Sequence, residues 1–361
     1  MSAPRNPTRR SVLAGAAATV CMPRPSLGQS LARVRLTLPW LAQGATAFVY
    51  VARALGIYKR YGLEVEISRG YGSLAAAQAV AQKRFDFGIV SAGPMILAST
   101  RGVALSGLAT INYDTTMGVL VRKDSPIRTP SDLVGKKVGS VLTSAEYPFF
   151  PAYAAKAGFD AAKVTVVQMD ARILERSVID GQVDAITTIG ASSIPLLAAQ
   201  KVEHRFFPYS VSGIAPYSNI ITARQDFLND QPALCEAVTR ALLEGLAFQL
   251  REPEKSIDLL VKEVPEFGAA ANGRESAMLS LGLLGWTILA PEAMDHGLGW
   301  SDPDRWKTTV DLTMAYAIPS GTPRPPVDDV AKNRFTGQQK LSPTEWAEAK
   351  KRFAPFGAML G

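Results

Sequence analysis

Cysteine and histidine are scarce in this sequence, and their scarcity excludes several classes of chemistry. The 361 residues contain two of each, namely Cys21, Cys235, His204 and His296. They form no Cys-x-x-Cys pair, no His-Glu-x-x-His motif and no cluster with the spacing of a zinc site. The carboxylates are scattered along helical segments, so no acid/base pair stands out either. We therefore expect no metal, no cofactor and no catalytic residue.

An excess of charge of one sign is also missing once a short N-terminal region is set aside. The formal charge is +7, from 39 basic and 32 acidic residues, but four arginines and no acidic residue lie within residues 1–30. The remaining 35 basic and 32 acidic side chains nearly balance. A nucleic-acid-binding surface needs a concentration of basic residues, so we expect no nucleic-acid partner.

The first thirty residues have the pattern of an export signal. Arg9 and Arg10 precede a short apolar segment rich in alanine and glycine, residues 12–22, and this order resembles the twin-arginine signal of bacteria. The segment is far shorter than the roughly 18–20 apolar residues that span a bilayer. We predict that residues 1–30 direct the protein to the periplasm. The alternative is a cytosolic protein with a basic N-terminus.

Cys21 lies near the end of that apolar segment, where some exported proteins carry a lipid anchor. The residue before it is Val20. A segment that resembled a lipoprotein cleavage site would have a small residue at this position. We therefore expect no lipid anchor, and we expect cleavage between Ser26 and Ser30. Cleavage there leaves Cys235 as the one remaining cysteine, which permits no internal disulfide.

The rest of the chain alternates short β-rich runs with Ala-rich helical runs, which is typical of an α/β fold with a mostly parallel sheet. Its length predicts about two globular units. The expected strands are Val34–Leu38, Glu64–Ser68, Phe87–Val90, Ala104–Ile111, Met117–Arg122, Lys137–Val141, Thr165–Gln168 and Ala185–Thr188. After about residue 222 the chain becomes mainly helical, and Ser342 and Glu345 have the capping-box spacing that begins a last helix.

A glycine-rich segment, residues 70–75, follows an expected strand and opens an expected helix. It matches the Gly-x-Gly-x-x-Ala fingerprint of dinucleotide sites. That fingerprint also needs an acidic residue at the end of the next strand, whereas Asp86 begins it. We therefore interpret the segment as a turn that lets the N–H groups of a helix N-terminus approach a small ligand, especially an anionic one.

The same arrangement recurs after other expected strands. Ser91 and Ala92 follow one of them, and Thr143 and Ser144 follow another. Each pair alone is an ordinary helix cap. However, the carboxyl ends of parallel strands are where open α/β sheets bind ligands. Together these segments predict two lobes whose strand ends face each other across a cleft.

Aromatic and amide side chains complete the candidate site. Trp40 ends the first expected strand, where its ring can stack on a planar ligand, and Gln43 adds a donor and an acceptor. The alternative is that Trp40 lies in the core. The candidate ligand-binding residues are Trp40, Gln43, Tyr71, Gly72, Ser73, Ser91, Ala92, Asn112, Thr143, Ser144, Gly190 and Tyr217.

Several segments, in their order along the chain, resemble the periplasmic solute-binding proteins of ABC importers. They are Ala52–Glu66, Phe85–Gly88 with Ser91, Pro130–Gly139, Ile179–Ala185 and Gly299–Trp306. The branch that they resemble joins the nitrate, sulfonate and taurine receptors with the thiamine-pyrimidine-precursor (NMT1/THI5-like) group. The resemblance covers nearly all of residues 34–335.

This resemblance implies an α/β, two-lobe periplasmic-binding-protein fold (type II), with two crossovers and a ligand cleft between lobes that close by a hinge. By that analogy, lobe one is residues 31–112 and 213–335, lobe two is residues 113–212, and residues 336–361 are a C-terminal helical extension. The implied function is that of a monomeric receptor, not an enzyme, which binds a small-molecule solute and delivers it to an ABC permease in the inner membrane.

The resemblance also indicates the class of ligand: a small organic anion or a heterocycle, such as a sulfonate, an aromatic carboxylate or a pyrimidine-like compound. The first loop of the pyrimidine group resembles Asp-Trp-x-Pro-Asn-x-x-His. Here Trp40 is kept, Gln43 lies near the asparagine position and Thr46 replaces the histidine.

Two alternative functions are compatible with the same fold. One is an enzyme that processes a pyrimidine precursor, although the cysteine-rich iron motif of a fungal relative is absent. The other is a ligand receptor for a membrane sensor.

Overall fold

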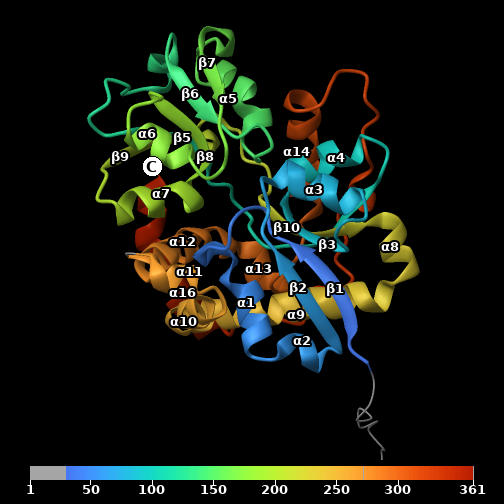
Figure 1. Ribbon diagram of the computed structural model, residues 1–361. Helices are drawn as coiled ribbons and strands as arrows, with labels where there is room; N and C mark the ends of the chain where they lie inside the picture. Colours follow the sequence, from blue (N-terminus) through green and yellow to red (C-terminus); the bar gives the residue numbers. More distant parts are fainter. Residues whose placement is uncertain (1–29, 271, 361) are drawn as a thin grey trace, which may run out of the picture. The chain divides into compact units, whose positions relative to one another are not determined.

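Two five-stranded sheets form the framework of the computed structural model, which describes residues 30–270 and 272–360 (Figure 1). The strands of sheet A are β1 (Ala32–Thr37), β2 (Leu63–Ser68), β3 (Phe87–Ser91), β4 (Leu105–Thr110) and β10 (Asn219–Arg224). The strands of sheet B are β5 (Met117–Arg122), β6 (Lys137–Ser140), β7 (Thr165–Gln168), β8 (Ala185–Ile189) and β9 (His204–Pro208). The spatial orders are β2-β1-β3-β10-β4 and β7-β6-β8-β5-β9.

The chain crosses between the sheets twice. It leaves sheet A after β4 to enter sheet B at β5, and it returns after β9 to sheet A at β10. The strand that follows each crossing, β5 or β10, is antiparallel to both of its neighbours, whereas β1 and β6 pair in parallel with theirs. This topology confirms the predicted two-lobe α/β fold with two crossovers. Both sheets are mixed, however, and not mostly parallel as the sequence pattern predicts.

We call the parts of the chain built on sheets A and B lobe one and lobe two. The strands fall within the ranges predicted for the two lobes, but the exact boundaries stay a prediction. The sequence pattern anticipates β1 to β8 to within a few residues and does not anticipate β9 or β10. Both missed strands pair with partners far away in the sequence.

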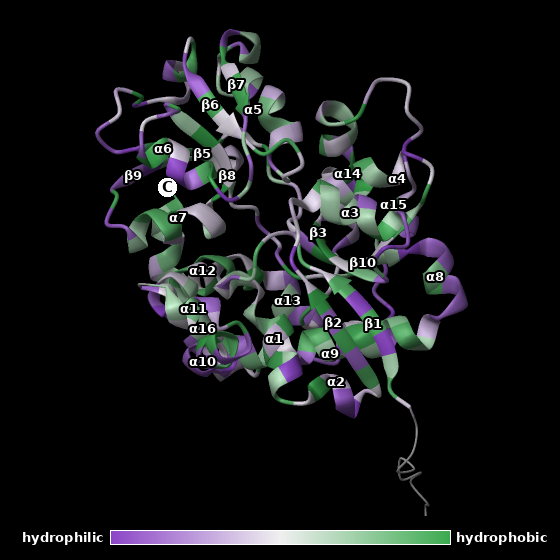
Figure 2. Cartoon of the chain, in the orientation of Figure 1, coloured by the Kyte–Doolittle hydropathy of each residue, from purple (hydrophilic) through white to green (hydrophobic). Residues whose placement is uncertain are grey.

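Helices cover the faces of both sheets. The α-helices are α1 (Ala47–Ala54), α2 (Ile57–Arg60), α3 (Ser73–Ala81), α4 (Ala92–Ser99), α5 (Phe150–Lys156), α6 (Leu174–Ile179), α7 (Gly190–Ala199), α8 (Gln225–Asp230), α9 (Pro232–Arg251), α10 (Pro253–Glu263), α11 (Glu266–Ala269), α12 (Gly273–Ile288), α13 (Pro291–His296), α14 (Pro303–Tyr316), α15 (Val327–Val330) and α16 (Pro343–Gly357). The 3-10 helices are η1 (Gly44–Thr46), η2 (Pro130–Leu133), η3 (Tyr147–Phe149), η4 (Ala161–Lys163), η5 (Tyr209–Ser212) and η6 (Ala358–Leu360). Figure 2 shows α8 and α10 as largely hydrophilic outer helices.

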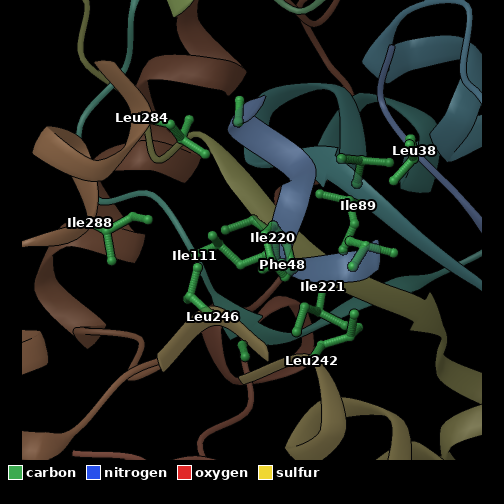
Figure 3. Close-up of a cluster of buried hydrophobic side chains, with 14 of the residues drawn as sticks. Leu38, Phe48, Ile89, Ile111, Ile220, Ile221, Leu242, Leu246, Leu284 and Ile288 are labelled. Atoms are coloured by element: carbon green, nitrogen blue, oxygen red, sulfur yellow. The ribbon is translucent and has the colours of Figure 1, made fainter. Parts of the chain in front are cut away.

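The core of lobe one lies between sheet A and the helices α1, α9 and α12. Figure 3 shows Ile220 and Ile221 of β10 beside Phe48 of α1 and Leu242 of α9. These four side chains are at most 1% exposed. Burying a large aliphatic or aromatic side chain contributes about 1.5–3 kcal/mol, so this layer fixes sheet A and the loops at its strand ends.

The C-terminal extension packs on lobe one through α16. The Ser342 side chain accepts a hydrogen bond from the Glu345 backbone N–H, and the Glu345 carboxylate accepts one from Ser342 N–H, as the capping-box spacing predicts. The helix then lies against α12 and α9. The final turn η6 reaches lobe two, where the Leu360 side chain lies close to Gly190 and η6 contacts β9. The extension therefore contacts both lobes.

The predicted twin-arginine signal and Cys21 fall on residues 1–29, outside the described part of the chain. Within the described part, no helix combines the length and the apolar character needed to cross a membrane. Cys235 is buried in α9, and burial raises the pKa of its thiol to about 12.

Candidate functional site

A cavity with a free volume of about 50 Å³ lies between the carboxyl ends of strands of the two sheets. In lobe one the lining includes Trp40 after β1 and Ser91 at the end of β3. In lobe two it includes Ser144 after β6 and Thr188 near the end of β8. The side chains at these strand ends therefore surround one cavity.

The lobe-one wall is built around the turn that begins α3. Gly72, with φ of 110°, precedes Ser73, and the Ser73 hydroxyl oxygen accepts a hydrogen bond from Ser91 N–H at 3.0 Å. The Ser73 hydroxyl also lies 3.2 Å from the Ser91 hydroxyl. This bond ties the α3 N-terminus to the end of β3. Trp40 and Gln43, both partly exposed, complete this wall.

The lobe-two wall contains a buried glutamate after β6. Glu146 is 1% exposed and accepts hydrogen bonds from the Ser144 hydroxyl and, at 3.2 Å, from the Thr187 hydroxyl, both at Oε1. Its Oε2 is buried and has no hydrogen-bond partner. A buried carboxylate oxygen without a partner is costly, so a donor that reached this oxygen would stabilise it.

A second glutamate on the same wall comes from α6. Glu175 is 7% exposed, and its Oε1 accepts a hydrogen bond of 2.6 Å from the hydroxyl of Ser193 in α7. Burial raises the pKa of both glutamates. The hydroxyl donors Ser144 and Thr187 partly oppose this rise at Glu146, and the charge of Glu175 adds to it. No lysine or arginine lies among the cavity-lining residues in the described chain. The cavity therefore has an acidic wall.

Sequence reasoning missed both glutamates. Glu146 lies two residues after Ser144, so the strand-end rule that selected Ser144 extends naturally to it. Glu175 has no comparable signal, because an acidic residue in the first turn of a helix normally faces solvent. Only the packing of α6 beside α7 buries it.

Six of the twelve predicted residues line the cavity: Trp40, Gln43, Gly72, Ser73, Ser91 and Ser144. Their contact with a ligand stays a prediction. Two others, Tyr71 and Thr143, lie at the edge where the lobes meet. The Thr143 hydroxyl donates to the Tyr71 carbonyl at 2.7 Å, and Leu74 N–H donates to the Thr143 carbonyl at 3.0 Å. The Tyr71 ring is 61% exposed. These two residues therefore join the lobes and do not line the cavity.

The remaining four predicted residues are not among the residues that line the cavity. The Asn112 amide donates to the Thr287 hydroxyl at 2.8 Å, and Tyr217 is buried against Trp306. Both lie in the segments where the chain crosses between lobes, so their polar groups are directed into the hinge region of lobe one. Ala92 and Gly190 begin α4 and α7 and are buried. Contact of these four residues with a ligand stays a prediction.

The lobes also meet on a second side of the cavity. The Ser280 hydroxyl of α12 donates to the Ala191 carbonyl of α7 at 2.8 Å and accepts from Ala45 N–H at 3.1 Å. Together with the Thr143 contacts, this bridge closes the cavity on two sides. The lobes are therefore in a closed arrangement around the site.

The raised pKa of Glu146 predicts a pH-dependent stability. The folded chain holds this proton to a higher pH than the unfolded chain, whose ordinary value is 4.5. The stabilising contribution is therefore full below that value and is lost as the pH rises through the raised pKa. A Glu146→Gln variant stays neutral, so we expect its unfolding free energy relative to wild type to increase between about pH 4 and about pH 7. Urea unfolding at both pH values measures this difference.

Glu345 provides a matched control of opposite sign. Arg251 and the Ser342 N–H lower the pKa of Glu345, so its stabilising contribution is present above the ordinary value of 4.5 and is lost as the pH falls. A Glu345→Gln variant should therefore lose stability relative to wild type as the pH rises, by a smaller amount because Glu345 is exposed. A pH-independent difference for Glu146→Gln would contradict the assignment.

Clusters of three or more histidine, cysteine, aspartate or glutamate side chains able to hold a metal ion do not occur among residues 30–270 and 272–360. The groups available at the cavity are hydroxyls, the two amides of Gln43 and Asn219, one indole, backbone N–H groups and two carboxylates. These groups can bind an uncharged or positively charged organic molecule through hydrogen bonds and stacking.

Comparisons with known proteins agree with this architecture. Residues 43–256 match the family model described as NMT1/THI5 like. The chain is 24% identical over 328 residues to a riboflavin-binding protein, RibY, of Chloroflexus aurantiacus, covering 90% of each chain. It is also 24% identical to a 4-amino-5-hydroxymethyl-2-methylpyrimidine phosphate synthase of Legionella pneumophila, covering 65% of this chain and 74% of the relative.

Solved structures show the same fold. The nitrate-binding protein NrtA of Synechocystis PCC 6803 matches with a TM-score of 0.62 at 14% identity, over 92% of this chain and 91% of that one. The aliphatic sulphonate-binding protein SsuA of Escherichia coli matches with a TM-score of 0.56 at 19% identity, over 69% and 83%. The family match spans more than half of the chain, and the two-lobe fold agrees with it. The chain therefore belongs to the NMT1/THI5-like family.

Proposed function

We propose that this protein is a substrate-binding protein that captures a small organic solute between its two lobes. The observation that carries the proposal is the closed cavity at the strand ends of both sheets, bridged by Thr143 on one side and by Ser280 on the other. A ligand that contacts both walls stabilises the closed arrangement relative to an open one. Equilibrium binding with lobe closure then suffices, and no covalent chemistry is needed.

The proposed partner is an ABC permease in the inner membrane, to which the closed, monomeric receptor delivers its solute in the periplasm. The fold that the chain shares with the nitrate-binding and sulphonate-binding proteins supports this proposal. The twin-arginine pattern of residues 1–30 supports export across the inner membrane.

The proposed ligand is a small planar heterocycle rather than a sulfonate or an aromatic carboxylate. Trp40 offers a ring for stacking, and the opposite wall presents hydrogen-bond acceptors at Glu146 and Glu175. The relatives named for binding riboflavin and for synthesising a pyrimidine phosphate support a heterocycle. Thr46 is buried and its hydroxyl donates to the Gln43 carbonyl at 3.1 Å, so it shapes the first loop.

A thermal-shift panel tests this proposal. The purified protein is heated with flavins, pyrimidines, aromatic carboxylates and sulfonates in turn. A ligand at 100 times its dissociation constant adds about 2.7 kcal/mol of stability, so a binding heterocycle should raise the melting temperature clearly. If no compound raises it and no small molecule co-purifies with the protein, the receptor proposal is wrong.

Trp40 provides a sharper test once a heterocyclic ligand is found. Replacing Trp40 with alanine should reduce affinity by about 1–3 kcal/mol, because the stacking surface is lost. Isothermal titration measures the change, and Trp286→Ala, on the far side of α12 against Gly357, is a matched control that should leave affinity unchanged. Equal affinities for Trp40→Ala and wild type would place the indole outside the ligand contact.

An enzyme on the same scaffold is the second candidate function. Two buried carboxylates with raised pKa values in one cavity are typical of acid/base sites, and one relative is named as a synthase. A turnover assay separates the candidates: the receptor returns its ligand chemically unchanged after prolonged incubation, whereas an enzyme converts it.

A further inference from the structure

The charges that face the cavity are all of one sign. Glu146 and Glu175 are its charged lining residues within the described chain, and both lie on the lobe-two wall. Neither of two arginines on nearby segments is among the lining residues: the Arg69 guanidinium stacks on the Tyr71 ring at 4.4 Å and has a buried Nη2 without a hydrogen-bond partner, and Arg172 pairs with Asp170 at 2.9 Å. The lobe-two wall therefore carries carboxylates without a basic partner.

The two carboxylates also retain unused acceptor capacity. The hydroxyls of Ser144 and Thr187 both donate to Oε1 of Glu146, and the buried Oε2 has no partner. The Ser193 hydroxyl donates to Oε1 of Glu175. A carboxylate can accept several hydrogen bonds, so each glutamate can take at least one more from a ligand. Both residues are more than nine-tenths buried, so bulk water does not compete strongly for these positions.

When the two glutamates are ionised, an anionic group placed against this wall would meet negative charge at low local dielectric, where like charges repel strongly. A positively charged or N–H-rich group would satisfy the free acceptors and neutralise the wall. On the opposite wall the Trp40 ring favours a cation in the same way, because the face of an aromatic ring is electronegative.

We propose that the site selects ligands that present a cationic or multiply N–H-donating group to Glu146 and Glu175, and that it discriminates against sulfonates and carboxylates. This inference rests on the proposed function, because it assigns the ligand class of the same cavity. It also reverses the anionic preference that the glycine turn at residues 70–75 suggests from sequence. The two glutamates are thus the specificity-determining residues of the site.

Three probes of similar size test the charge preference directly, and two of them, benzamidine and benzoate, also share a planar charged group. Benzamidine, benzoate and benzenesulfonate share one aromatic ring and differ in the charged group. At pH 7 we expect benzamidine to bind the wild-type protein at least tenfold more tightly than either anion, measured by isothermal titration at low ionic strength. This comparison uses wild-type protein, so no variant needs to fold.

The glutamates are then tested by neutral substitutions that keep their size. Glu175→Gln and Glu146→Gln should each lower benzamidine affinity at least tenfold and should reduce the preference over benzoate. Glu203→Gln is the matched control, because Glu203 lies on lobe two, is exposed and pairs with Lys123 at 3.1 Å. This variant should bind benzamidine and benzoate with the affinities of the wild-type protein. Circular dichroism verifies that each variant is folded.

The outcomes separate this inference from the proposed function. Tighter binding of benzoate or benzenesulfonate than of benzamidine would overturn the inference and leave the receptor proposal intact. If none of the probes binds, the molecule released from the purified protein decides: a cation or an amino-bearing compound supports the inference, and an anion overturns it. If no probe binds and no molecule is released, the proposed function fails and the inference with it.

Discussion

Replacing Gly72 with alanine is expected to weaken ligand binding by roughly 5- to 150-fold while the protein remains folded. A Cβ atom at this position would lie 2.2 Å from the carbonyl oxygen of Thr143 and 2.9 Å from the backbone N of Ser144, both in lobe two. Overpacking against backbone atoms costs about 1–3 kcal/mol, and 1.4 kcal/mol is tenfold in affinity. The clash exists in the closed arrangement, so the variant favours open lobes.

Gly102 provides a matched control for the backbone strain. Its φ of 105° is close to the 110° of Gly72, but a Cβ atom there would meet nothing within 4 Å. Both alanine variants should lose a similar stability, about 1–3 kcal/mol, because a non-glycine residue is strained at such φ values. Only Gly72→Ala should lose affinity in isothermal titration. Equal affinity in the two variants would show that lobe closure at Gly72 does not contribute to binding.

Replacing Phe353 with alanine is expected to lower the free energy of unfolding by about 3–5 kcal/mol, the range for deleting a buried aromatic side chain. Phe353 in α16 is 1% exposed, and its ring packs so closely on α12 that a Cβ atom at Gly285 would lie 2.9 Å from it. The extension is therefore part of the core of lobe one. Urea unfolding of the purified protein measures the loss.

Tyr316→Ala is the control for this substitution, because the Tyr316 side chain is 38% exposed at the end of α14. We expect it to cost about 1 kcal/mol or less. Neither variant should change ligand affinity under conditions where the protein is folded, since both residues lie outside the cavity lining. A loss below 1 kcal/mol for Phe353→Ala would mean that α16 is only loosely attached.

The fold could be predicted from sequence where the signal is local. The strands β1 to β8 are short β-rich runs between helices or turns, and the capping box of Ser342 and Glu345 marks the start of α16. β9 and β10 were not anticipated, although they pair with strands that were: Phe206 pairs with Leu120, and Ile220 pairs with Val90. No local pattern specifies such partners.

The site was predictable in part for the same reason. Ser73, Ser91 and Ser144 follow from the rule that strand ends bind ligands, and they line one cavity. Asn112 and Tyr217 also lie near strand ends, but the crossing segments turn their side chains into lobe one. Whether a side chain at a strand end faces the cleft or the hinge depends on how the two lobes pack, and a single sequence does not encode that visibly.

The acidic wall is the feature of the site that the sequence revealed least. Sequence alone suggested a small organic anion or a heterocycle, and the glycine turn and hydroxyls at the helix N-termini favoured an anionic group. Glu175 was indistinguishable from a solvent-facing residue until the hydrogen bond from Ser193 and its burial were known. Burial of a charged group is a property of tertiary packing, so the charge preference of the site emerges only from the folded structure.

Native mass spectrometry of the protein, purified without refolding, tests the central claim most directly. A second, denaturing run releases whatever the cavity holds. The account predicts one small organic molecule per chain, a heterocycle with a basic or N–H-donating group, which leaves the protein chemically unchanged. A protein that carries nothing, and whose melting temperature no heterocycle, carboxylate or sulfonate raises, would contradict the claim that the two lobes enclose a solute-binding site.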